Sequence, residues 1–399
     1  MKFSVLLPTR NRPEYLKFAI NSVLKQDYEN WEIIVSDNFS EQDICGYIES
    51  LKDARIKYYR TDSFVSVTEN WNNTLSRCTG DYVIMLGDDD CLMKGYFTTF
   101  CKLIEEYPCP DFIYTSAYIY AYPEVMPGKP EGFLVDYGNA SFLEGRDKPF
   151  WLSKEEALKL VKQSMNFQMV FANNMQYALI NRAFIEKLQK NGLFFQSPYP
   201  DFYAMSAMML NADRILACPF SFVTIGICPK SFGFYYFNQC EKKGVEFLNH
   251  AAEMHEDTAL QKWILPGTNM NSAWLISLER VRNNYKDKFS LEVNYNRYRF
   301  VQIVSVFSAF ALSKRKSNSG LLTLWKMMSG KEKWLYGVPL YVISLCTKIV
   351  PQKLRKKVIS VLTLLTGVNP RFHSKRIKGE YQSIESVFEQ TTPSYHKYY

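Results

Sequence analysis

Short apolar runs alternate with segments of helical periodicity along the N-terminal part of the chain. The runs at residues 3–7, 31–36 and 82–86 are predominantly apolar and predict buried strands, and residues 56–59 predict a short strand between the last two. The segments between them, such as residues 13–24 and 67–77, repeat apolar positions every three or four residues and therefore predict helices. Strands that alternate with helices at this spacing predict an α/β fold, in which helices flank both faces of a mostly parallel sheet.

The remaining sequence predicts three parts. Residues 122–149 are rich in Gly and Pro and predict an irregular region at the mouth of a site, and residues 218–228 predict a further strand. Mainly helical patterns follow. We therefore expect an α/β domain over residues 1–230, a helical extension over 231–299 and a basic helical region over 300–399.

Composition narrows the class of protein. Of the 399 residues, 47% are hydrophobic and 16% are aromatic, which excludes a disordered, collagen-like or low-complexity chain. The nine Cys lack the paired CxxC spacing of a zinc site, and the apolar run after Met1 is too short for a signal peptide. We expect a cytoplasmic protein with free thiols.

Polar side chains gather where the predicted parallel strands end. The carboxyl ends of such strands share one edge of the sheet, where open α/β sheets bind their ligands. The first strand is followed by a turn with two arginines, the second by one acid and the fourth by three consecutive acids. The side chains concerned are Pro8, Thr9, Arg10, Arg12, Asp37, Asp88, Asp89 and Asp90.

The acidic run at residues 88–90 predicts a cation site. Three adjacent carboxylates repel one another unless a cation or strong donors neutralise them. Hard oxygen ligands select Mg²⁺ or Mn²⁺, and Mg²⁺ is usually shared between one or two carboxylates and substrate phosphates. An Asp-rich turn that caps a helix is the alternative. The position at the carboxyl end of a strand favours a metal bound to a diphosphate.

The other candidates have simpler chemistry. Asp37 is placed to accept hydrogen bonds from a base or ribose, although Asp-Asn is also common in turns. Arg10 and Arg12 are suited to phosphate oxygens, and Lys230 is either a further phosphate contact or a solvated surface lysine. Asp201 follows two prolines at the start of a predicted helix, where an Asp is either a rigidly aimed general base or an N-cap.

Together, these motifs resemble the family 2 inverting glycosyltransferases of the GT-A fold over about residues 1–230. The resemblance rests on VLLPTRNR at 5–12, WEIIVSDN at 31–38 and GDYVIMLGDDD at 80–90. It implies transfer of a sugar from a nucleotide-diphosphate donor, with a UDP-sugar favoured. The acceptor is a hydroxyl group of a glycan or a lipid-linked molecule, and the anomeric carbon is inverted.

The resemblance also implies roles for single residues. Pro8, Thr9 and Asp37 cradle the nucleoside. The acidic run corresponds to the DxD-type motif that meets the ribose and the metal, with Asp89 or Asp90 touching the cation directly.

The resemblance implies a catalytic base as well. Asp201 corresponds to it, although the Glu that often precedes this Asp in the family is absent. The QxxRW motif of processive synthases is also absent, which implies addition of one sugar per encounter.

The C-terminal region is strongly basic. Residues 300–399 hold 16 Lys or Arg and 4 Asp or Glu, whereas the whole chain has a net charge of +8. Uncharged runs at 300–312 and 334–347 are shorter than the roughly 18 residues that span a bilayer. Two interpretations stay open: helices that lie in a membrane interface, or a helical subdomain that packs on the α/β domain. The first implies peripheral contact at the inner face of the cell membrane and a lipid-linked acceptor, and no nucleic-acid partner is expected.

Other functions receive less support. A nucleotidyltransferase or a Rossmann dehydrogenase would need a Gly-rich loop after the first strand, but Gly is absent from residues 1–45. A catalytically silent module that binds a nucleotide sugar stays open. His250 and His255 are five residues apart, which does not match an HExxH metal motif and favours structural roles.

Overall fold

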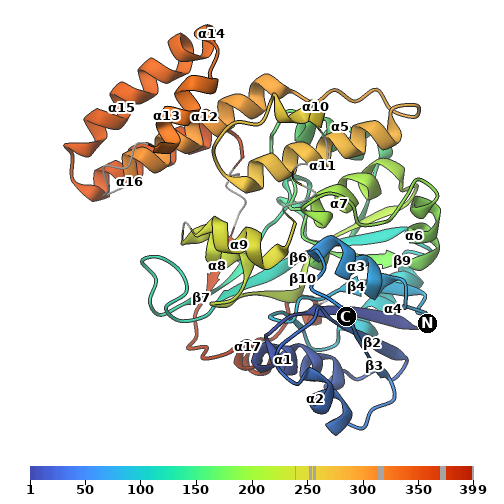
Figure 1. The fold of residues 1–399 in the computed structure, drawn as a ribbon. Coiled ribbons are helices and arrows are strands. Elements are labelled where there is room, and N and C mark those ends of the chain that lie inside the picture. The colour runs from blue at the N-terminus through green and yellow to red at the C-terminus, as the bar shows by residue number, and fades with distance from the viewer. Residues whose placement is uncertain (239, 251–253, 255–257, 313–318, 369–373, 398–399) are drawn as a thin grey trace.

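The computed structural model describes residues 1–238, 240–250, 254, 258–312, 319–368 and 374–397. Their strands form one mixed sheet of eleven strands in the order β11-β7-β6-β9-β4-β1-β2-β3, and β10 pairs with β5, β6 and β8 (Figure 1). The strands are β1 (Phe3–Thr9), β2 (Trp31–Asp37), β3 (Ile56–Arg60), β4 (Tyr82–Met85), β5 (Cys91–Leu92), β6 (Phe112–Ala121), β7 (Phe133–Tyr137), β8 (Phe150–Leu152), β9 (Ala178–Asn181), β10 (Ile215–Ile227) and β11 (Ser374–Ile377).

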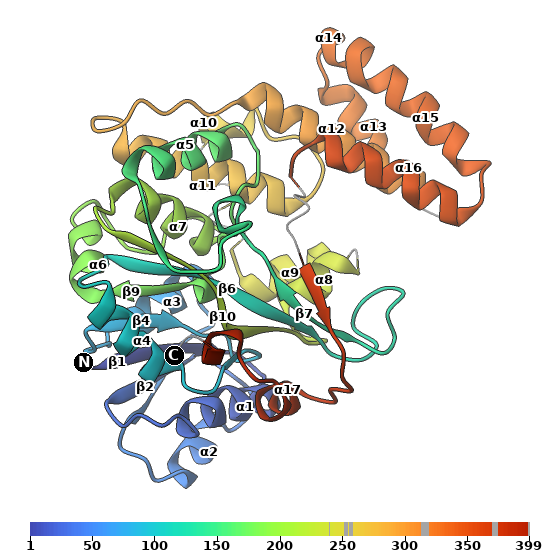
Figure 2. The same ribbon diagram turned by 180° about the vertical axis from the view of Figure 1, so that it is seen from behind.

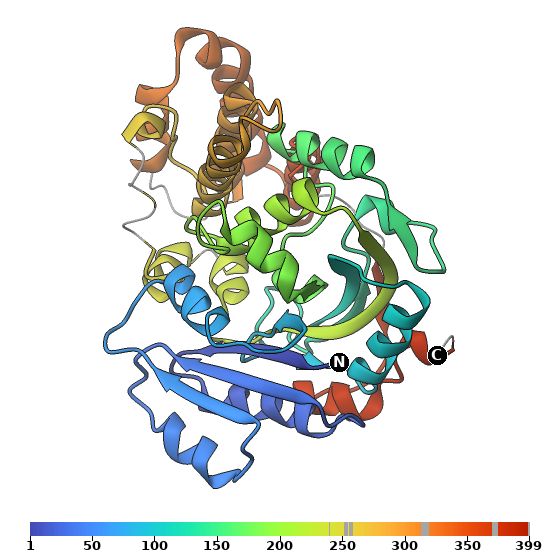
Figure 3. The same cartoon turned by 90° about the vertical axis from the view of Figure 1, so that its right-hand side faces the viewer.

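Helices cover both faces of this sheet, as the view in Figure 3 shows for the N-terminal strands. One face carries α1 (Pro13–Leu24), α4 (Tyr96–Glu106) and α17 (Ile384–Gln390). The other carries α3 (Val67–Leu75), α5 (Lys154–Met165), α6 (Arg182–Gln189), α7 (Pro200–Asn211) and α11 (Asn269–Tyr285). Shorter helices are α2 (Ile44–Ser50), α8 (Phe232–Phe237), α9 (Glu241–Leu248) and α10 (Thr258–Gln261).

The central strands are buried on both faces because their side chains alternate between two cores. In β1, Val5 and Leu7 pack into one core and Leu6 packs into the other. This explains why the strand has a continuous apolar sequence rather than an alternating one. The α/β fold with helices on both faces is therefore confirmed.

The first four strands that the sequence predicts run parallel to one another. β1 pairs with β2 and with β4, and β2 pairs with β3, all in parallel. The register places Thr9 opposite Asp37 at the ends of β1 and β2. The segments after β1, β2 and β4 therefore leave the sheet at the same edge, and this arrangement positions the site.

Two parts of the chain differ from the expectation. The segment 122–149 contains strand β7, which pairs antiparallel with β6, so it is less irregular than its Gly and Pro content predicts. Residues 374–397 do not belong to a separate C-terminal region. β11 pairs with β7, and side chains of α17 and Tyr395 are buried in the core beside α1. The separate C-terminal helical region therefore ends before residue 374.

The other C-terminal helices are α12 (Tyr295–Leu312), α13 (Ser319–Met327), α14 (Gly330–Glu332), the π-helical turn η3 (Lys333–Gly337), α15 (Val338–Lys348) and α16 (Gln352–Leu365). The uncharged run at 300–312 lies in α12. Ile303, Val304 and Phe307 are buried in a small core with side chains of α13 and α15, whereas Val301 packs into a core of the α/β domain. α13 to α16 project beyond the rest of the molecule (Figures 1 and 2). In the described part of the chain, no helix is long and apolar enough to cross a bilayer.

Candidate functional site

The ends of three parallel strands bring their polar side chains together. Thr9 Oγ1, at the end of β1, donates a hydrogen bond of 2.6 Å to Asp88 Oδ2, just beyond β4. The backbone N–H of Asn38 donates to the carbonyl of Thr9, so the segment after β2 is fixed to the same point. The structure thus joins three of the segments that the sequence predicts to form the site.

Asp37 is fully buried, and it is held by the loop after β2 and by side chains of β3. Its carboxylate accepts hydrogen bonds from the N–H of Ser40 at 2.9 Å and from the hydroxyl of Tyr58 at 2.7 Å. The guanidinium of Arg60, at the end of β3, lies 3.6 Å from Asp37 Oδ2. The carboxylate therefore shapes the loop at the end of β2.

Arg12 neutralises two members of the acidic run. Its guanidinium lies 2.5 Å from Asp88 Oδ1 and 3.4 Å from Asp89 Oδ1. Burial lowers the pKa of Arg12, but the two carboxylates outweigh burial and raise this pKa above its ordinary value. The second oxygen of Asp89, Oδ2, is buried and accepts no hydrogen bond. Asp88 Oδ1 also accepts no hydrogen bond but pairs with Arg12, whereas the described residues provide no such partner for Asp89 Oδ2.

Asp90 is occupied by three hydrogen-bond donors. Oδ1 accepts from the backbone N–H of Gly226 on β10 at 2.8 Å, and Oδ2 accepts from the N–H of Gly87 at 2.9 Å and from Gln176 Nε2 at 2.8 Å. Gly226 is required for this approach, because an added Cβ would lie 1.9 Å from the carbonyl oxygen of Asp89. Asp90 therefore connects the acidic loop to β10.

Burial sets the electrostatics of the acidic run. It raises the pKa of Asp88 to about 6, although Arg12 and Thr9 oppose the shift. It raises the pKa of Asp90 to about 7, and the neighbouring charge of Asp89 adds to this effect. Burial thus disfavours the charged forms of these carboxylates, and a further cation beside them would stabilise those charged forms.

The turn after β1 is held by the loop after β2. Arg10 donates to the carbonyl oxygens of Asn38 and Phe39, and its guanidinium lies 3.5 Å from the centre of the Phe64 ring. Burial lowers the pKa of Arg10. Pro8, like Arg10, is only partly buried. Both residues lie at the edge where the sequence predicts a nucleotide.

The part of the chain from Lys230 to His250 contains α8 and α9, and we call it the α8–α9 segment. It contacts this turn. Lys230 Nζ lies 2.7 Å from Glu14 Oε1 and 3.1 Å from the carbonyl oxygen of Asn11, so it ties the start of the segment to α1. Near its other end, the ring of Phe247 lies 5.1 Å from the guanidinium carbon of Arg12. Asn249 donates to the carbonyl of Phe64. In this conformation, Lys230 contacts the protein itself.

Asp201 occupies the first turn of α7. Tyr199 is the N-cap residue and Pro200 the first helical residue, so Asp201 is not the N-cap that the alternative interpretation requires. Burial raises the pKa of Asp201 to about 7. The preceding loop is fixed to the start of α3, because Thr68 Oγ1 donates to the carbonyl of Ser197 at 2.7 Å.

The α8–α9 segment also contacts the start of α7. The rings of Phe232 and His250 each lie 5.3 Å from that of Tyr199. The buried oxygens Tyr199 Oη and Glu241 Oε1 accept or donate no hydrogen bond. The segment thus contacts the start of α7 through Phe232 and His250, and Arg12 through Phe247. His250 is buried with both ring nitrogens unpartnered, and burial lowers its pKa to about 4, whereas His255 lies outside the described residues.

Sequence reasoning missed five residues of this site. Gln176 and Gly226 come from segments that follow the parallel strands and have no local signature. Phe247 and Glu241 both lie in α9, which the sequence predicts to belong to a separate helical extension. Arg60 had a usable signal, because it ends the third parallel strand and therefore lies at the same edge as Asp37.

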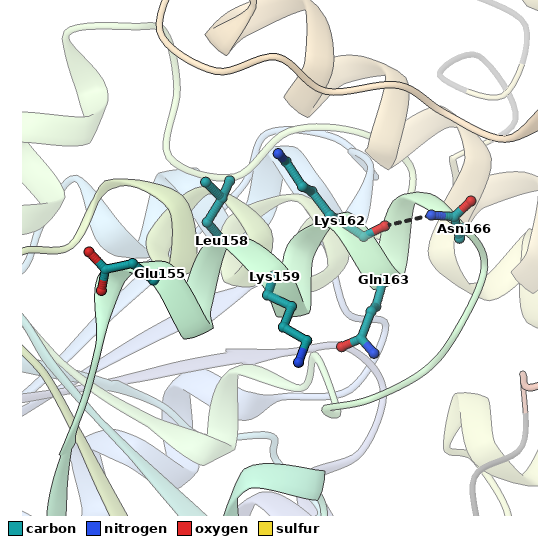
Figure 4. A pocket seen from close by; sticks show the side chains of 6 residues that line it. All are labelled: Glu155, Leu158, Lys159, Lys162, Gln163 and Asn166. Atoms are coloured by element: carbon teal, nitrogen blue, oxygen red, sulfur yellow. Dashed lines mark hydrogen bonds between the residues drawn. The ribbon is translucent and has the colours of Figure 1, made fainter.

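Two surface concavities lie elsewhere. One of about 270 Å³ runs along α5 and is lined by Glu155, Leu158, Lys159, Lys162, Gln163 and Asn166 (Figure 4). Another of about 370 Å³ shares Asn166 and extends to Trp263 and residues 292–296. Neither contains a residue of the strand-end site, and in Figure 4 the labelled side chains belong to one helix and the residue that caps it.

Comparison with known proteins agrees with this geometry. Residues 4–149 match the family described as Glycosyl transferase family 2. The chain is 30% identical over 193 residues to a GalNAc(5)-diNAcBac-PP-undecaprenol beta-1,3-glucosyltransferase of Campylobacter jejuni, covering 48% of this chain and 57% of the relative. It is 30% identical over 87 residues to the UDP-Glc:alpha-D-GlcNAc-diphosphoundecaprenol beta-1,3-glucosyltransferase WfgD of Escherichia coli, covering 22% and 34%. The chain thus spans about half or less of the length of these relatives.

Among solved structures, S. aureus TarS 1-349 in complex with UDP-GlcNAc matches with a TM-score of 0.43 and 14% identity, over 98% of this chain and 92% of TarS. This likeness is too weak to assign a residue or a ligand. The family match confirms the resemblance to family 2 glycosyltransferases over residues 4–149.

Proposed function

We propose that this chain, whose residues 4–149 match the family described as Glycosyl transferase family 2, transfers a sugar from a nucleotide-diphosphate donor to a hydroxyl group of a lipid-linked glycan. The observation that carries the proposal is the convergence of Thr9, Asp37 and the acidic run at one edge of the parallel sheet. The names of the two curated relatives, which mention diphospho-undecaprenol acceptors and in one case UDP-Glc, support a lipid-linked acceptor and a UDP-sugar.

The nucleotide would bind at the ends of β1 and β2. Pro8 and Thr9 leave β1 there, and Asp37 shapes the facing loop. Arg10 lies at the same edge, partly exposed, where its guanidinium can reach a phosphate oxygen. Asp88 would then lie next to the ribose, because Thr9 holds it beside the end of β1.

The residues present fit a divalent cation held mainly through Asp89. Asp89 Oδ2 is buried and has no hydrogen-bond partner, whereas the oxygens of Asp90 already accept from three donors. The described residues contain no group of three or more metal-binding side chains. A site with one available carboxylate and two phosphates matches the usual Mg²⁺ or Mn²⁺ arrangement. When bound there, the cation would neutralise charge that develops on the departing diphosphate.

Asp201 would act as the general base. The acceptor oxygen attacks the anomeric carbon on the face opposite the diphosphate, and its proton passes to the carboxylate of Asp201. The bond from the anomeric carbon to the diphosphate oxygen breaks with its electron pair on the diphosphate, so the configuration is inverted. A base with a pKa near 7, which burial gives Asp201, is well matched to this role at neutral pH.

Turnover of UDP-sugars with Mn²⁺ tests the proposal. We expect release of UDP by the wild-type chain, accelerated by an undecaprenyl-diphosphate glycan acceptor, and loss of release in Asp89→Ala. Asp213→Ala is the matched control, because Asp213 is an exposed acid that pairs with Lys154 and Lys187. Equal turnover in the Asp89→Ala and Asp213→Ala variants would refute the metal role. Tight nucleotide-sugar binding without any turnover would instead establish a catalytically silent module.

A further inference from the structure

Helix α15 buries Leu340, Ser344 and Thr347 and exposes most of its large apolar side chains. Ser344 and Thr347 are buried against α12, where Ser344 Oγ donates to the carbonyl of Phe307 at 3.3 Å. The opposite face exposes large apolar side chains. Soluble helices normally have the reverse arrangement, because burial of apolar area stabilises the fold. The exposed face therefore lacks the apolar environment that its sequence favours.

The exposed side chains form one continuous stripe. They recur at intervals of three or four residues from η3 through α15, so they share one side of the helix. Trp334 is 79% exposed at one end and Ile349 is 86% exposed at the other. With about 1.5 Å per residue, the stripe is about 22 Å long. We call it the apolar stripe, and it consists of Trp334, Leu335, Val338, Tyr341, Val342, Leu345 and Ile349.

Basic residues flank the apolar stripe at both ends. Lys331 and Lys333 precede it, and Lys353, Lys356 and Lys357 follow it on α16. The sequence contains no Asp or Glu from residue 333 to residue 379. Glu332, between Lys331 and Lys333, is paired with Arg299, so the charges left around the stripe are mainly positive.

The turn after α15 fixes this geometry. Arg355 donates to the carbonyl oxygens of Thr347 at 2.9 Å and Lys348 at 2.8 Å, which closes the C-terminus of α15. Lys348 Nζ lies 3.6 Å from the centre of the Phe310 ring, so this cation is held against α12. The basic end of the stripe is therefore built into the fold.

We propose that the apolar stripe and its flanking lysines bind the surface of an anionic lipid bilayer. α15 then lies in the plane of the interface, with its apolar face among the acyl chains and its lysines at the headgroups. Trp and Tyr at the stripe are typical of this depth. A second copy of the chain is a poorer partner, because the two basic surfaces would face each other. The projection of α13 to α16 beyond the body leaves this face accessible (Figures 1 and 2).

Co-sedimentation of the full chain with vesicles tests the proposal without any sugar transfer. We expect binding to phosphatidylcholine vesicles that contain phosphatidylglycerol, weaker binding to phosphatidylcholine alone, and a decrease with salt. Changing Trp334, Val342 and Leu345 together to Ser should reduce partitioning by about tenfold or more. These side chains are exposed, so the variant should keep the wild-type melting temperature. Leu193→Ser, at a 63% exposed position in the loop before α7, is the matched control and should bind like the wild type.

A second set of measurements separates lipid from protein partners. Trp334 fluorescence should shift to the blue on vesicle addition, and the shift should be missing in Trp334→Phe. Changing Lys353, Lys356 and Lys357 to Gln should weaken binding to anionic vesicles only. The proposal is overturned if the wild type ignores both kinds of vesicle, or if the triple Ser variant binds unchanged. It is also overturned if the wild type dimerises without lipid in sedimentation velocity and the triple Ser variant does not.

Discussion

Asp89 and Asp90 are adjacent acids, but we expect only the removal of Asp90 to destabilise the fold strongly. Asp90→Ala leaves the backbone N–H groups of Gly87 and Gly226 without their acceptor, while Gln176 is partly exposed and can turn to water. A buried donor without a partner costs about 1–3 kcal/mol, so two of them lower the free energy of unfolding by at least about 2 kcal/mol.

Asp89→Ala removes little that stabilises the fold. Its Oδ2 accepts no hydrogen bond, and its Oδ1 is 3.4 Å from Arg12, which keeps its closer contact with Asp88. The charge of Asp89 also raises the pKa of Asp88 and Asp90, so its removal relieves repulsion. We therefore expect a smaller loss in the free energy of unfolding than for Asp90→Ala, because Arg12 keeps Asp88 as its partner and no buried charge is left uncompensated.

Thermal unfolding followed by circular dichroism distinguishes the two roles. The measurement is made in EDTA, so that metal binding does not contribute to stability. With an unfolding entropy of about 2.1 cal/mol/K per residue over 399 residues, 1 kcal/mol shifts the melting temperature by about 1.2 °C. Asp90→Ala should therefore melt at least about 2 °C below the wild type, and Asp89→Ala should melt close to it. The reasoning is refuted if Asp90→Ala melts with the wild type while Asp89→Ala is the destabilised variant.

Three further predictions concern other parts of the molecule. Asp201→Asn should lower kcat by about 10²–10⁴, and wild-type kcat/KM should fall as the pH drops below about 7, since a protonated Asp201 cannot accept the proton; an unchanged pH profile in the variant would exclude Asp201 as the base. Gly226→Ala should lower both the stability of the protein and its UDP-sugar turnover, because the added Cβ would lie 1.9 Å from the carbonyl oxygen of Asp89. A soluble variant with normal kinetics would contradict this packing. Burial raises the pKa of Glu32, but Lys57, Ser4 and Lys2 outweigh it and lower this pKa to about 2. The ionised Glu32 therefore stabilises the fold above about pH 4.5, and this stabilisation is lost as the pH falls toward 2. In Glu32→Gln, the free energy of unfolding should depend less on pH over this range.

The parallel part of the fold could be predicted from the sequence because its signals are local. β1, β2 and β4 are each buried on both faces, and this burial requires continuous apolar runs. The antiparallel part has no such signal. β8 and β9 have three and four residues, too few to show a period, and β11 is a polar strand that pairs with β7 from more than 200 residues away.

The site follows the same division. Thr9, Asp37 and Asp88 could be placed together because parallel strands that share an edge bring their ends together. The donors to Asp90 could not be found in this way, since Gly226 lies within the long strand β10 and Gln176 in a short turn before β9. The exposed apolar side of α15 could be predicted only in part. An uncharged run indicates apolar surface, but only packing shows that the run at 300–312 is largely buried and that from Trp334 onward large side chains are exposed.

Calorimetric titration of UDP tests most directly whether the strand ends form a metal-dependent nucleotide site. For the wild-type chain, Mn²⁺ should tighten UDP binding by about tenfold or more, which corresponds to about 1.4 kcal/mol. Asp89→Ala should lose this gain while it keeps the wild-type melting temperature. The account is contradicted if UDP, GDP and dTDP all fail to bind, or if Mn²⁺ strengthens UDP binding equally in the wild type and in Asp89→Ala.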